Sequence, residues 1–330
     1  MIRGFQVSRM IRLAADLEIA DKLPFGERRS VVEIAALSAV QAMPLLRVLR
    51  ALSSFGIFCV DAAGSVAHTP LSLLLRADAE RSLRPAAITL AARGSWGAWS
   101  ELDAAMHGEV PHRKAWGASR FEYLRDHSVE GRNFDALMGS DPGNRHEAVA
   151  AAYDFSAAVS IADIGGGNGA LLRKILERNP TPRGIVFDRD DVVAAISPIL
   201  REDGRIESVA GDFFEEVPAG ADLYLLVRVL HDWPDDDCIR ILCTCRKAMN
   251  AGSRVLVIEQ FLEPDPAKGA PMDYLSDMQM MAMFGSARER TRDEFDELLN
   301  TAGLEMTRVI PTASPAWIIE ACRNDEEPAR

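Results

Sequence analysis

Residues 159–172 read VSIADIGGGNGALL, and this stretch decides the fold of the chain. A short β-branched run ends in an acid, Asp163. Four glycines follow within five residues, among them Gly165, Gly167 and Gly169, and then an apolar helical pattern begins. Glycine lets the backbone turn tightly and approach a ligand, and a helix N-terminus offers unpaired N–H groups and a positive dipole end. The stretch therefore predicts a strand, a glycine loop and a helix that bind a nucleotide-like cofactor.

Two cofactors compete for this loop. The string G-x-G-x-x-A fits a dinucleotide fingerprint, and Asp188 lies about 20 residues on, where such folds place an acid that binds ribose. The same residues also read D-x-G-x-G-x-G, which resembles the first motif of S-adenosylmethionine (SAM) methyltransferases. Because SAM has no pyrophosphate, its loop mainly needs close backbone approach, and Asp163 could face the cofactor ammonium. The rest of the chain has to decide between them.

The length and composition are those of a globular protein. Its 330 residues suit two domains, with 48% hydrophobic and 26% charged residues. No apolar run reaches the roughly 20 residues of a membrane span, and no signal peptide is expected. Five cysteines at no framework spacing predict free thiols in a reducing, cytoplasmic setting. The net charge of −12 disfavours nucleic acid and anionic membranes as partners.

Three regions follow one another along the chain. Residues 1–80 read as helix, turn, helix and hairpin, which is a winged-helix arrangement. Residues 81–150 read as a mostly helical, aromatic bridge. Residues 151–330 alternate strands and helices, which predicts a mostly parallel sheet covered on both faces. The expected strands are 159–163, 184–188, 205–210, 221–227 and 254–259, the expected helices are 169–178, 190–201 and 235–249, and a hairpin of 304–310 and 316–322 closes the sheet.

A polar group stands at the end of each parallel strand, where ligands bind in open parallel sheets. In chain order these are Asp163, Asp188, Asp212 with Phe213, His231 and Glu259. Histidine is the side chain best suited to take a proton near neutral pH. The acids that follow at 235–237 are expected in the first turn of a helix, where dipole complementation explains them better than a metal does. We therefore expect no metal.

Several further motifs resemble one family. LLRVLRALSSFGIF, DIGGGNG, VFD, GDFF, VLHDWPDDD, VIEQFL and ARERTRDEFDELLNTAGL together resemble the SAM-dependent O-methyltransferases of the caffeic-acid and plant-natural-product type and their bacterial secondary-metabolism relatives. The resemblance implies an α/β, Rossmann-like catalytic domain with a seven-stranded, mostly parallel sheet. It also implies that the N-terminal winged-helix domain forms a homodimer. The expected activity is methyl transfer from SAM to a hydroxyl, phenolic for preference, of an aromatic or polyketide-like small molecule.

The same resemblance implies a role for individual residues. His231 would be the general base, flanked by Glu259 and Glu289. The cofactor would be held by Asp163, Gly165, Gly167, Gly169, Asp188, Asp212 and Phe213. Arg228 could replace a lysine that many relatives carry one position earlier, where this chain has Val227. The acceptor would be contacted by Asp232, Met280, Met283, Phe284, Trp116, Ala118 and Phe121.

Three other functions remain open at this point. Some bacterial relatives keep the SAM site but act as hydroxylases or decarboxylases, although the retained His231, Glu259 and Glu289 argue against altered chemistry. A winged-helix DNA-binding regulator would use Arg47 and Arg50, but the acidic chain disfavours it. An NAD dehydrogenase would bind NADH rather than SAM in the glycine loop.

Overall fold

The computed structural model describes residues 2–140, 144–200 and 204–324, without the side chains of 196–200. The chain forms two compact units, which we describe separately. Met1–Gly97 and Phe121–Pro142 form the first, and Ala98–Arg120 and Gly143–Arg330 form the second. The chain passes from one unit to the other within two helices, α6 (Arg93–Ser100) and α8 (Arg120–Asp126).

The first unit is built from short helices and a small sheet. Its elements are α1 (Gly4–Asp16), β1 (Arg29–Ser30), α2 (Val31–Leu37), α3 (Ala42–Ser53), β2 (Cys59–Val60), β3 (Ser65–Ala67), α4 (Pro70–Leu73), α5 (Arg84–Leu90) and α9 (Ser128–Gly139). The expected hairpin is present as β2 and β3, and β1 adds a third, unpredicted strand in the order β1-β3-β2. Since β1 has only two residues, it carries no readable alternation.

Local chemistry explains why this unit folds as it does. Ser30 and Glu33 form a reciprocal capping box at the start of α2. Leu45, Leu49 and Leu52 repeat at helical spacing on α3 and are buried in the core of the unit.

No single helix in the described residues is long and apolar enough to cross a membrane. The bent pair α2 and α3 meets the length and hydropathy criteria only when the two helices are taken together.

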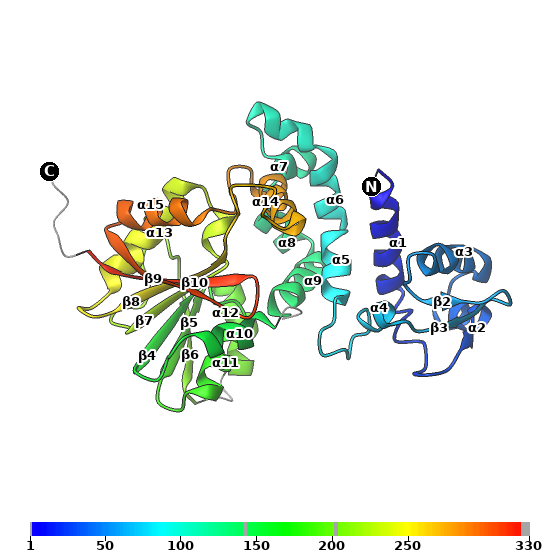
Figure 1. Ribbon diagram of the computed structural model, residues 1–330, viewed down its shortest axis with the longest axis horizontal. Helices are drawn as coiled ribbons and strands as arrows, with labels where there is room; N and C mark the ends of the chain where they lie inside the picture. Colours follow the sequence, from blue (N-terminus) through cyan, green and yellow to red (C-terminus); the bar gives the residue numbers. More distant parts are fainter. Residues whose placement is uncertain (1, 141–143, 201–203, 325–330) are drawn as a thin grey trace. The chain divides into compact units, whose positions relative to one another are not determined.

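The second unit carries a seven-stranded sheet between helices (Figure 1). Its elements are η1 (Leu102–His107), α7 (Pro111–Trp116), α10 (Arg145–Ala152), β4 (Ser160–Ile164), α11 (Ala170–Arg178), β5 (Arg183–Asp188), α12 (Asp190–Leu200), β6 (Ile206–Ala210), β7 (Leu223–Val227), η2 (Leu230–Asp232), α13 (Asp235–Ala248), β8 (Arg254–Gln260), α14 (Pro271–Phe284), α15 (Arg292–Thr301), β9 (Leu304–Pro311) and β10 (Ala316–Arg323). The five parallel strands lie within a residue or two of their predicted positions.

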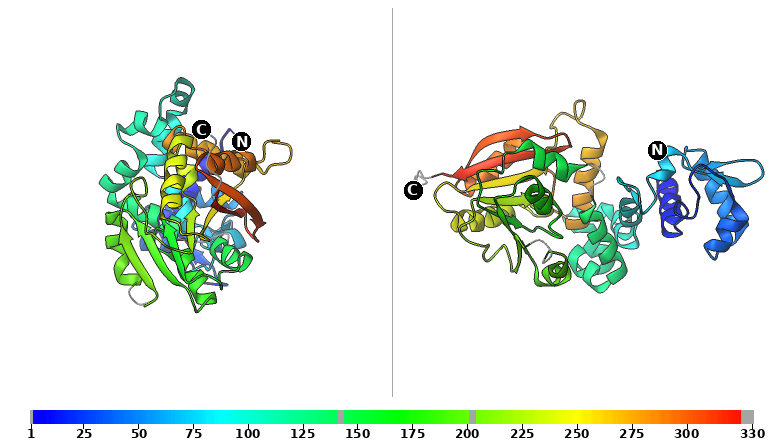
Figure 2. Two further views of the ribbon diagram at one scale, coloured as in Figure 1. Left: turned by 90° about the vertical axis from the view of Figure 1, so that its left-hand side faces the viewer. Right: turned by 90° about the horizontal axis from the view of Figure 1, so that it is seen from below.

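The strand order is β6-β5-β4-β7-β8-β10-β9. Strands β4 to β8 are parallel, whereas β10 is antiparallel to both β8 and β9, so the terminal hairpin inserts its second strand next to β8. The two terminal strands, coloured red, lie together at one end of the sheet (Figure 2). The mostly parallel sheet with an N-terminal helical unit confirms the predicted fold class.

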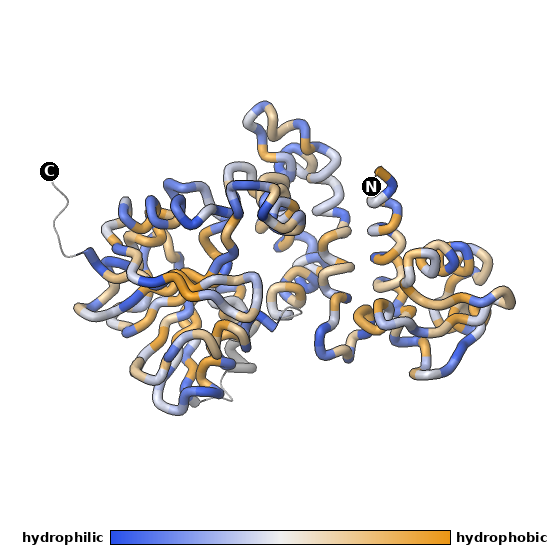
Figure 3. Tube along the Cα trace, in the orientation of Figure 1, coloured by the Kyte–Doolittle hydropathy of each residue, from blue (hydrophilic) through white to orange (hydrophobic). Residues whose placement is uncertain are grey.

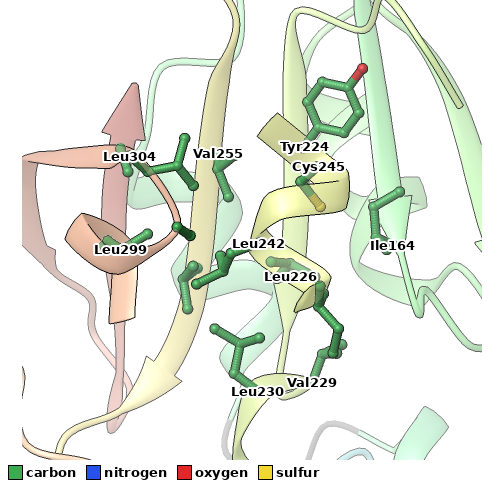
Figure 4. Packing of buried hydrophobic residues seen from close by; sticks show 14 of the residues in the cluster. Ile164, Tyr224, Leu226, Val229, Leu230, Leu242, Cys245, Val255, Leu299 and Leu304 are labelled. Carbon is green, nitrogen blue, oxygen red and sulfur yellow. The ribbon is translucent and has the colours of Figure 1, made fainter. Parts of the chain in front are cut away.

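Alternate residues of the central strands supply two separate cores. Tyr224 and Leu226 of β7 belong to the core beneath α13 and α15, and Leu223 and Leu225 belong to the core beneath α10 and α11. This follows from the two-residue side-chain period of a strand. Apolar residues accordingly follow the strands in Figure 3, and Figure 4 shows the α13 side of the sheet, where Leu242 and Cys245 approach the side chains of β7 and β8.

The sheet reverses its order at β4. The chain proceeds from β4 to β5 and β6 on one side and then returns to β7 on the other. Ligands bind outside the carboxyl ends of strands at such a switch point. The glycine loop follows β4 there, and His231 follows β7, the neighbour of β4.

Candidate active site

His231 lies in a buried cluster with two glutamates. It belongs to η2, the short turn after β7, and is only 4% exposed. Its Nδ1 atom lies 3.1 Å from Glu289 Oε1 and 3.9 Å from Glu259 Oε2. Glu259 is near the end of β8, whereas Glu289 lies between α14 and α15. Three segments that are distant in sequence thus bring the three predicted catalytic side chains together.

The contact with Glu289 determines which ring nitrogen is available. An ionised carboxylate only accepts hydrogen bonds, so we assign Nδ1–H of His231 as the donor to Glu289. In the neutral ring, Nε2 then carries the lone pair. Asp232 Oδ1 lies 3.5 Å from Nε2, and the Asp232 side chain is 22% exposed. The nitrogen able to accept a proton is therefore the one beside Asp232.

Charges around the imidazole act in opposite directions. Burial and the Arg228 cation lower the pKa of His231, but Glu259, Asp232 and Glu289 raise it, and the net direction is upward from 6.5. Burial raises the pKa of Glu259. For Glu289, burial also raises the pKa, but the hydrogen bond and charge of His231, together with the Arg228 and Arg290 cations, outweigh burial, and the net direction is downward. Glu289 is therefore the carboxylate that stays ionised beside the imidazole.

Backbone contacts hold both glutamates in place. Leu230 N–H donates to Glu259 Oε1 (3.1 Å), and the N–H of Glu289 donates to Asp277 Oδ1 (3.0 Å). The other oxygen of each glutamate, Oε2, is buried without a hydrogen-bond partner among the described residues. Asp277 was not anticipated from the sequence, because α14 was considered only as a wall for the acceptor.

The same trio has the composition of a cation site. The candidate ligand atoms of His231, Glu259 and Glu289 lie within 4.8 Å of one another. A histidine with two carboxylates can bind transition metals. The expectation that no metal is needed therefore stays a prediction.

The glycine loop connects β4 to α11 through left-handed backbone. Gly165, Gly167 and Gly169 have φ values of +69°, +53° and +69°, a region that other residues rarely adopt. A Cβ at Gly165 would also lie 2.9 Å from Val229 Cγ2, in the segment that leads to His231. Glycine at this position is therefore required both by conformation and by close packing.

Two carboxylates lie at this loop. Asp163 is 2% exposed, and its Oδ1 has no hydrogen-bond partner among the residues described. Burial, together with the charge of Asp188, raises the pKa of Asp163 to about 7. Asp188 accepts hydrogen bonds from the N–H groups of Gly167 (2.9 Å) and Arg189 (2.7 Å). A buried carboxyl with an unsatisfied oxygen is suited to a cationic ligand.

The remaining predicted cofactor residues lie on neighbouring strand ends. Asp212 follows β6, is exposed, and accepts the N–H of Phe214 with its side chain (2.9 Å). Phe213 is half-buried and meets Trp233 edge to face, with ring centroids 5.8 Å apart. Arg228, just after β7, has a φ of +52°, unusual for a residue with a side chain.

The predicted acceptor residues divide between the two units. Met280 and Met283 are buried on α14, and Met283 packs in a small apolar cluster with Ala98 and Ala282. Phe284, Trp116 and Ala118 belong to the same second unit. Phe121 belongs to the first unit, where its ring meets Phe134 edge to face at 6.5 Å. Helix α14 therefore contributes Met283 to an apolar cluster, and its contact with the acceptor stays a prediction.

Comparison with known proteins identifies the chain. A family model described as the O-methyltransferase domain matches residues 99–305, and one described as the O-methyltransferase dimerisation domain matches residues 1–78. The chain belongs to the SAM-dependent O-methyltransferase family. It is 39% identical over 327 residues to a phenazine O-methyltransferase of Lysobacter antibioticus, covering 97% of this chain and 94% of that protein.

Two further relatives bear on the chemistry of this O-methyltransferase. A phenazine-1-carboxylate N-methyltransferase of Pseudomonas aeruginosa is 31% identical over 328 residues, with 98% of this chain and 96% of that protein covered. A solved O-methyltransferase from neocarzinostatin biosynthesis, in complex with SAM and 2-hydroxy-5-methyl naphthoic acid, is similar with a TM-score of 0.83 and 32% identity, covering 96% of this chain and 95% of that one. SAM is the cofactor, and the loop with its buried Asp163, whose Oδ1 has no hydrogen-bond partner among the described residues, suits this cation.

Proposed function

We propose that this O-methyltransferase methylates an aromatic hydroxyl and that His231 is its general base. One observation supports this most: Nδ1 of a buried imidazole donates to Glu289, beside Glu259, and leaves Nε2 to accept a proton. Carboxylates next to a histidine favour the imidazolium that forms when a proton is taken up. The arrangement is that of an oriented base.

The energetics explain why a base is needed. A phenol has a pKa of about 10, so its ionisation at pH 7 costs roughly 4 kcal/mol. When bound, SAM supplies a methyl group on a positively charged sulfonium. Proton transfer from the acceptor hydroxyl to His231 Nε2 during attack avoids prior ionisation, and Glu289 and Glu259 stabilise the resulting charge. Alignment of the hydroxyl with the methyl group supplies further acceleration.

The upward direction of the His231 pKa sets the active pH range. Only the neutral ring can take the proton, so kcat/KM should rise with pH, with its midpoint above 6.5. The stability contribution has the opposite dependence. A raised folded-state pKa means that this contribution is complete below pH 6.5 and is lost as pH rises through the folded-state value.

The predicted cofactor residues supply complementary groups in this proposal. Asp163 faces the ammonium of the cofactor and Asp188 the ribose hydroxyls. Asp212 and Phe213 hold the adenine, with Arg228 near them. The glycines at 165, 167 and 169 approach the methionine end. The buried Asp163, with an oxygen that has no hydrogen-bond partner among the described residues, and the left-handed loop support this arrangement.

The apolar side chains of α14 are suited to contact a flat aromatic acceptor. Met280, Met283 and Phe284 are the proposed contacts on that helix, and Trp116, Ala118 and Phe121 are further candidates. Methionine adapts its shape to flat apolar groups. Asp232 would contact the acceptor hydroxyl, since it lies beside Nε2 of His231. The phenazine and naphthoic acid named for the relatives belong to the same chemical class.

Nitrogen methylation is the second candidate, because one relative is named as an N-methyltransferase. A neutral ring nitrogen attacks with its own lone pair and has no proton to lose, so a base would be superfluous. The oriented base, His231, therefore favours an oxygen acceptor over a nitrogen acceptor in this chain.

Residues 1–78 match a dimerisation domain, and we propose a homodimer, which light scattering on the purified protein would test.

The decisive assay follows label from methyl-labelled SAM to a panel of hydroxylated phenazines, naphthoates and phenols, and to matched ring-nitrogen acceptors. We expect O-methylated products and a loss of about 10²–10⁴-fold in turnover for His231→Gln. Glu289→Gln should lose less, because the ring keeps a partner on Nδ1. Products labelled on nitrogen alone, or full turnover by His231→Gln, would refute the proposal.

A further inference from the structure

Arg290 is a fully buried cation beside the catalytic cluster. It directly follows Glu289, and its side chain is 0% exposed. A buried charge is costly unless it is paired and hydrogen-bonded. The family resemblance implies a role for the neighbouring glutamate and none for this arginine. Its partners therefore require an explanation.

The Arg290 side chain binds mainly around the turn that carries His231, and its Nη1 also donates to the carbonyl of Arg288 (3.4 Å). Nη1 donates to the carbonyl of Leu230 (2.9 Å), and Nη2 donates to the carbonyl of Trp233 (2.8 Å). Nε and Nη2 both donate to Asp235 Oδ1, at 3.0 and 2.7 Å. Leu230 immediately precedes His231, and Trp233 follows it by two residues. The planar guanidinium thus binds both ends of the histidine turn at once.

Asp235 completes this arrangement. It lies in the first turn of α13, where the helix dipole also favours a carboxylate. Burial raises its pKa, but the hydrogen bonds and charges of Arg290 and Arg288 together outweigh this effect and hold the pKa of Asp235 below its usual value. Asp235 was expected only to complement the helix dipole. In the structure it also neutralises the buried guanidinium.

The backbone of Arg290 is fixed independently of its side chain. Its carbonyl accepts the N–H of Leu262 (2.9 Å), and Arg290 forms a parallel bridge with Phe261, just beyond β8. The preceding residue, Glu289, is held by Asp277 and contacts the imidazole. Two consecutive residues therefore hold His231 in place. Glu289 contacts the imidazole ring, and Arg290 binds the backbone carbonyls on both sides of it.

Apolar packing holds the turn on its remaining side. Leu230 is 0% and Val229 6% exposed, and both belong to the core beneath α13 and α15 (Figure 4). Packing of this kind fixes the position of the turn but not the orientation of its carbonyls. The guanidinium contributes to that orientation, because its donors have a fixed fork geometry, and the Cys238 thiol donates to the same two carbonyls (3.1 and 3.4 Å).

We propose that Arg290 is a positioning residue that sets the orientation of the His231 ring through the carbonyls of Leu230 and Trp233. This inference rests on the proposed role of His231 as the base. The hydrogen bonds of Arg290 go to backbone carbonyls and Asp235 and not to the imidazole ring. The loss of Arg290 should therefore lower kcat only as far as His231 contributes to kcat.

The test is a double-mutant cycle of Arg290→Lys with His231→Gln, measured as kcat with labelled SAM and a phenolic acceptor. Lysine keeps the charge for Asp235 but cannot reach both carbonyls in one plane. We expect Arg290→Lys to lower kcat about 10- to 100-fold in the native background and less than twofold in the His231→Gln background. The dissociation constant of SAM should change less than twofold in either background.

Arg288→Lys is the matched control. Arg288 also binds Asp235 (2.9 Å), and it contacts Glu294, but neither carbonyl of the histidine turn is among its partners. Its replacement should change kcat less than twofold. If Arg290→Lys does not fold, as judged by thermal melting, Asp235→Asn takes its place in the cycle, with a smaller loss expected and the same non-additivity.

The outcomes separate the two claims. Equal losses from Arg290→Lys in both backgrounds, or a parallel rise in the SAM dissociation constant, would overturn the positioning role and leave the base intact. Equal losses from Arg288→Lys and Arg290→Lys would do the same. If His231→Gln keeps native turnover, the base proposal itself fails.

Discussion

Replacement of Asp163 by asparagine should remove a pH dependence of cofactor binding. The Asp163 carboxyl is buried with a pKa of about 7, raised by burial and by Asp188, and its Oδ1 has no partner among the described residues. A cofactor ammonium beside it favours the ionised form. Below pH 7 the empty protein must therefore release a proton to bind the cofactor, and affinity should fall.

The size of the effect follows from that pKa. If only the ionised form binds, the dissociation constant at pH 5.5 exceeds that at pH 7 by (1 + 10^1.5)/(1 + 1), or about 16-fold. The ligand ammonium, with a pKa of about 8, stays charged across this range. Asp163→Asn should bind more weakly at pH 7 and show a dependence of less than twofold.

The assay is isothermal titration calorimetry with S-adenosylhomocysteine. This product keeps the ammonium but lacks the sulfonium, so protonation of His231 has less influence on its binding. Asp236→Asn, at an exposed acid on α13, is the control and should keep the native dependence. A flat profile for the native protein, or a 16-fold dependence retained by Asp163→Asn, would refute the reasoning.

Three other predictions test separate parts of the structure. Extensive treatment with EDTA should leave methyl transfer unchanged, and a loss restored by a divalent metal would show that the His231 cluster is a metal site. Gly165→Ala should destabilise the fold by about 1–2 kcal/mol and weaken cofactor binding, because φ is +69° there. Gly204→Ala, whose added Cβ meets none of the described residues within 4 Å, should be neutral in thermal melting and cofactor titration. Burial raises the pKa of Glu320, but Arg308, Tyr153 and Thr307 together lower it to about 2. The contribution of Glu320 to the free energy of unfolding should therefore be complete above pH 4.5 and lost as pH falls toward 2. Glu320→Gln should cost about 1.5–3 kcal/mol at pH 7 in urea unfolding, and an unchanged midpoint would contradict this.

The parallel part of the sheet was predictable because its sequence signals are local. Buried strands read as apolar runs, such as LYLLV at 223–227, and the glycine loop identifies the strand before it. The terminal hairpin was also readable, but periodicity alone could not show that β10, rather than β9, would pair with β8. In the first unit, β1 was missed because two residues carry no pattern.

The candidate-site residues that lie at the ends of parallel strands were predictable from the sequence. His231, Glu259 and Asp163 each follow or end a predicted strand, and parallel strands place these ends along one edge of a sheet. Arg290 and Asp277 were not predictable, because their importance lies in backbone carbonyls and N–H groups that they bind across long sequence separations. A sequence pattern identifies side chains but not the backbone groups that they meet.

The dependence of turnover on the pKa of the acceptor hydroxyl tests the base role of His231 most directly. Turnover of native protein and His231→Gln should be compared at pH 7.5 over one series of ring-substituted phenols of graded pKa. If His231 takes the proton, the variant should lose about 10²–10⁴-fold with phenols of pKa near 10 and less than tenfold with phenols already ionised. A loss that is the same for every member of the series would contradict the base role of His231.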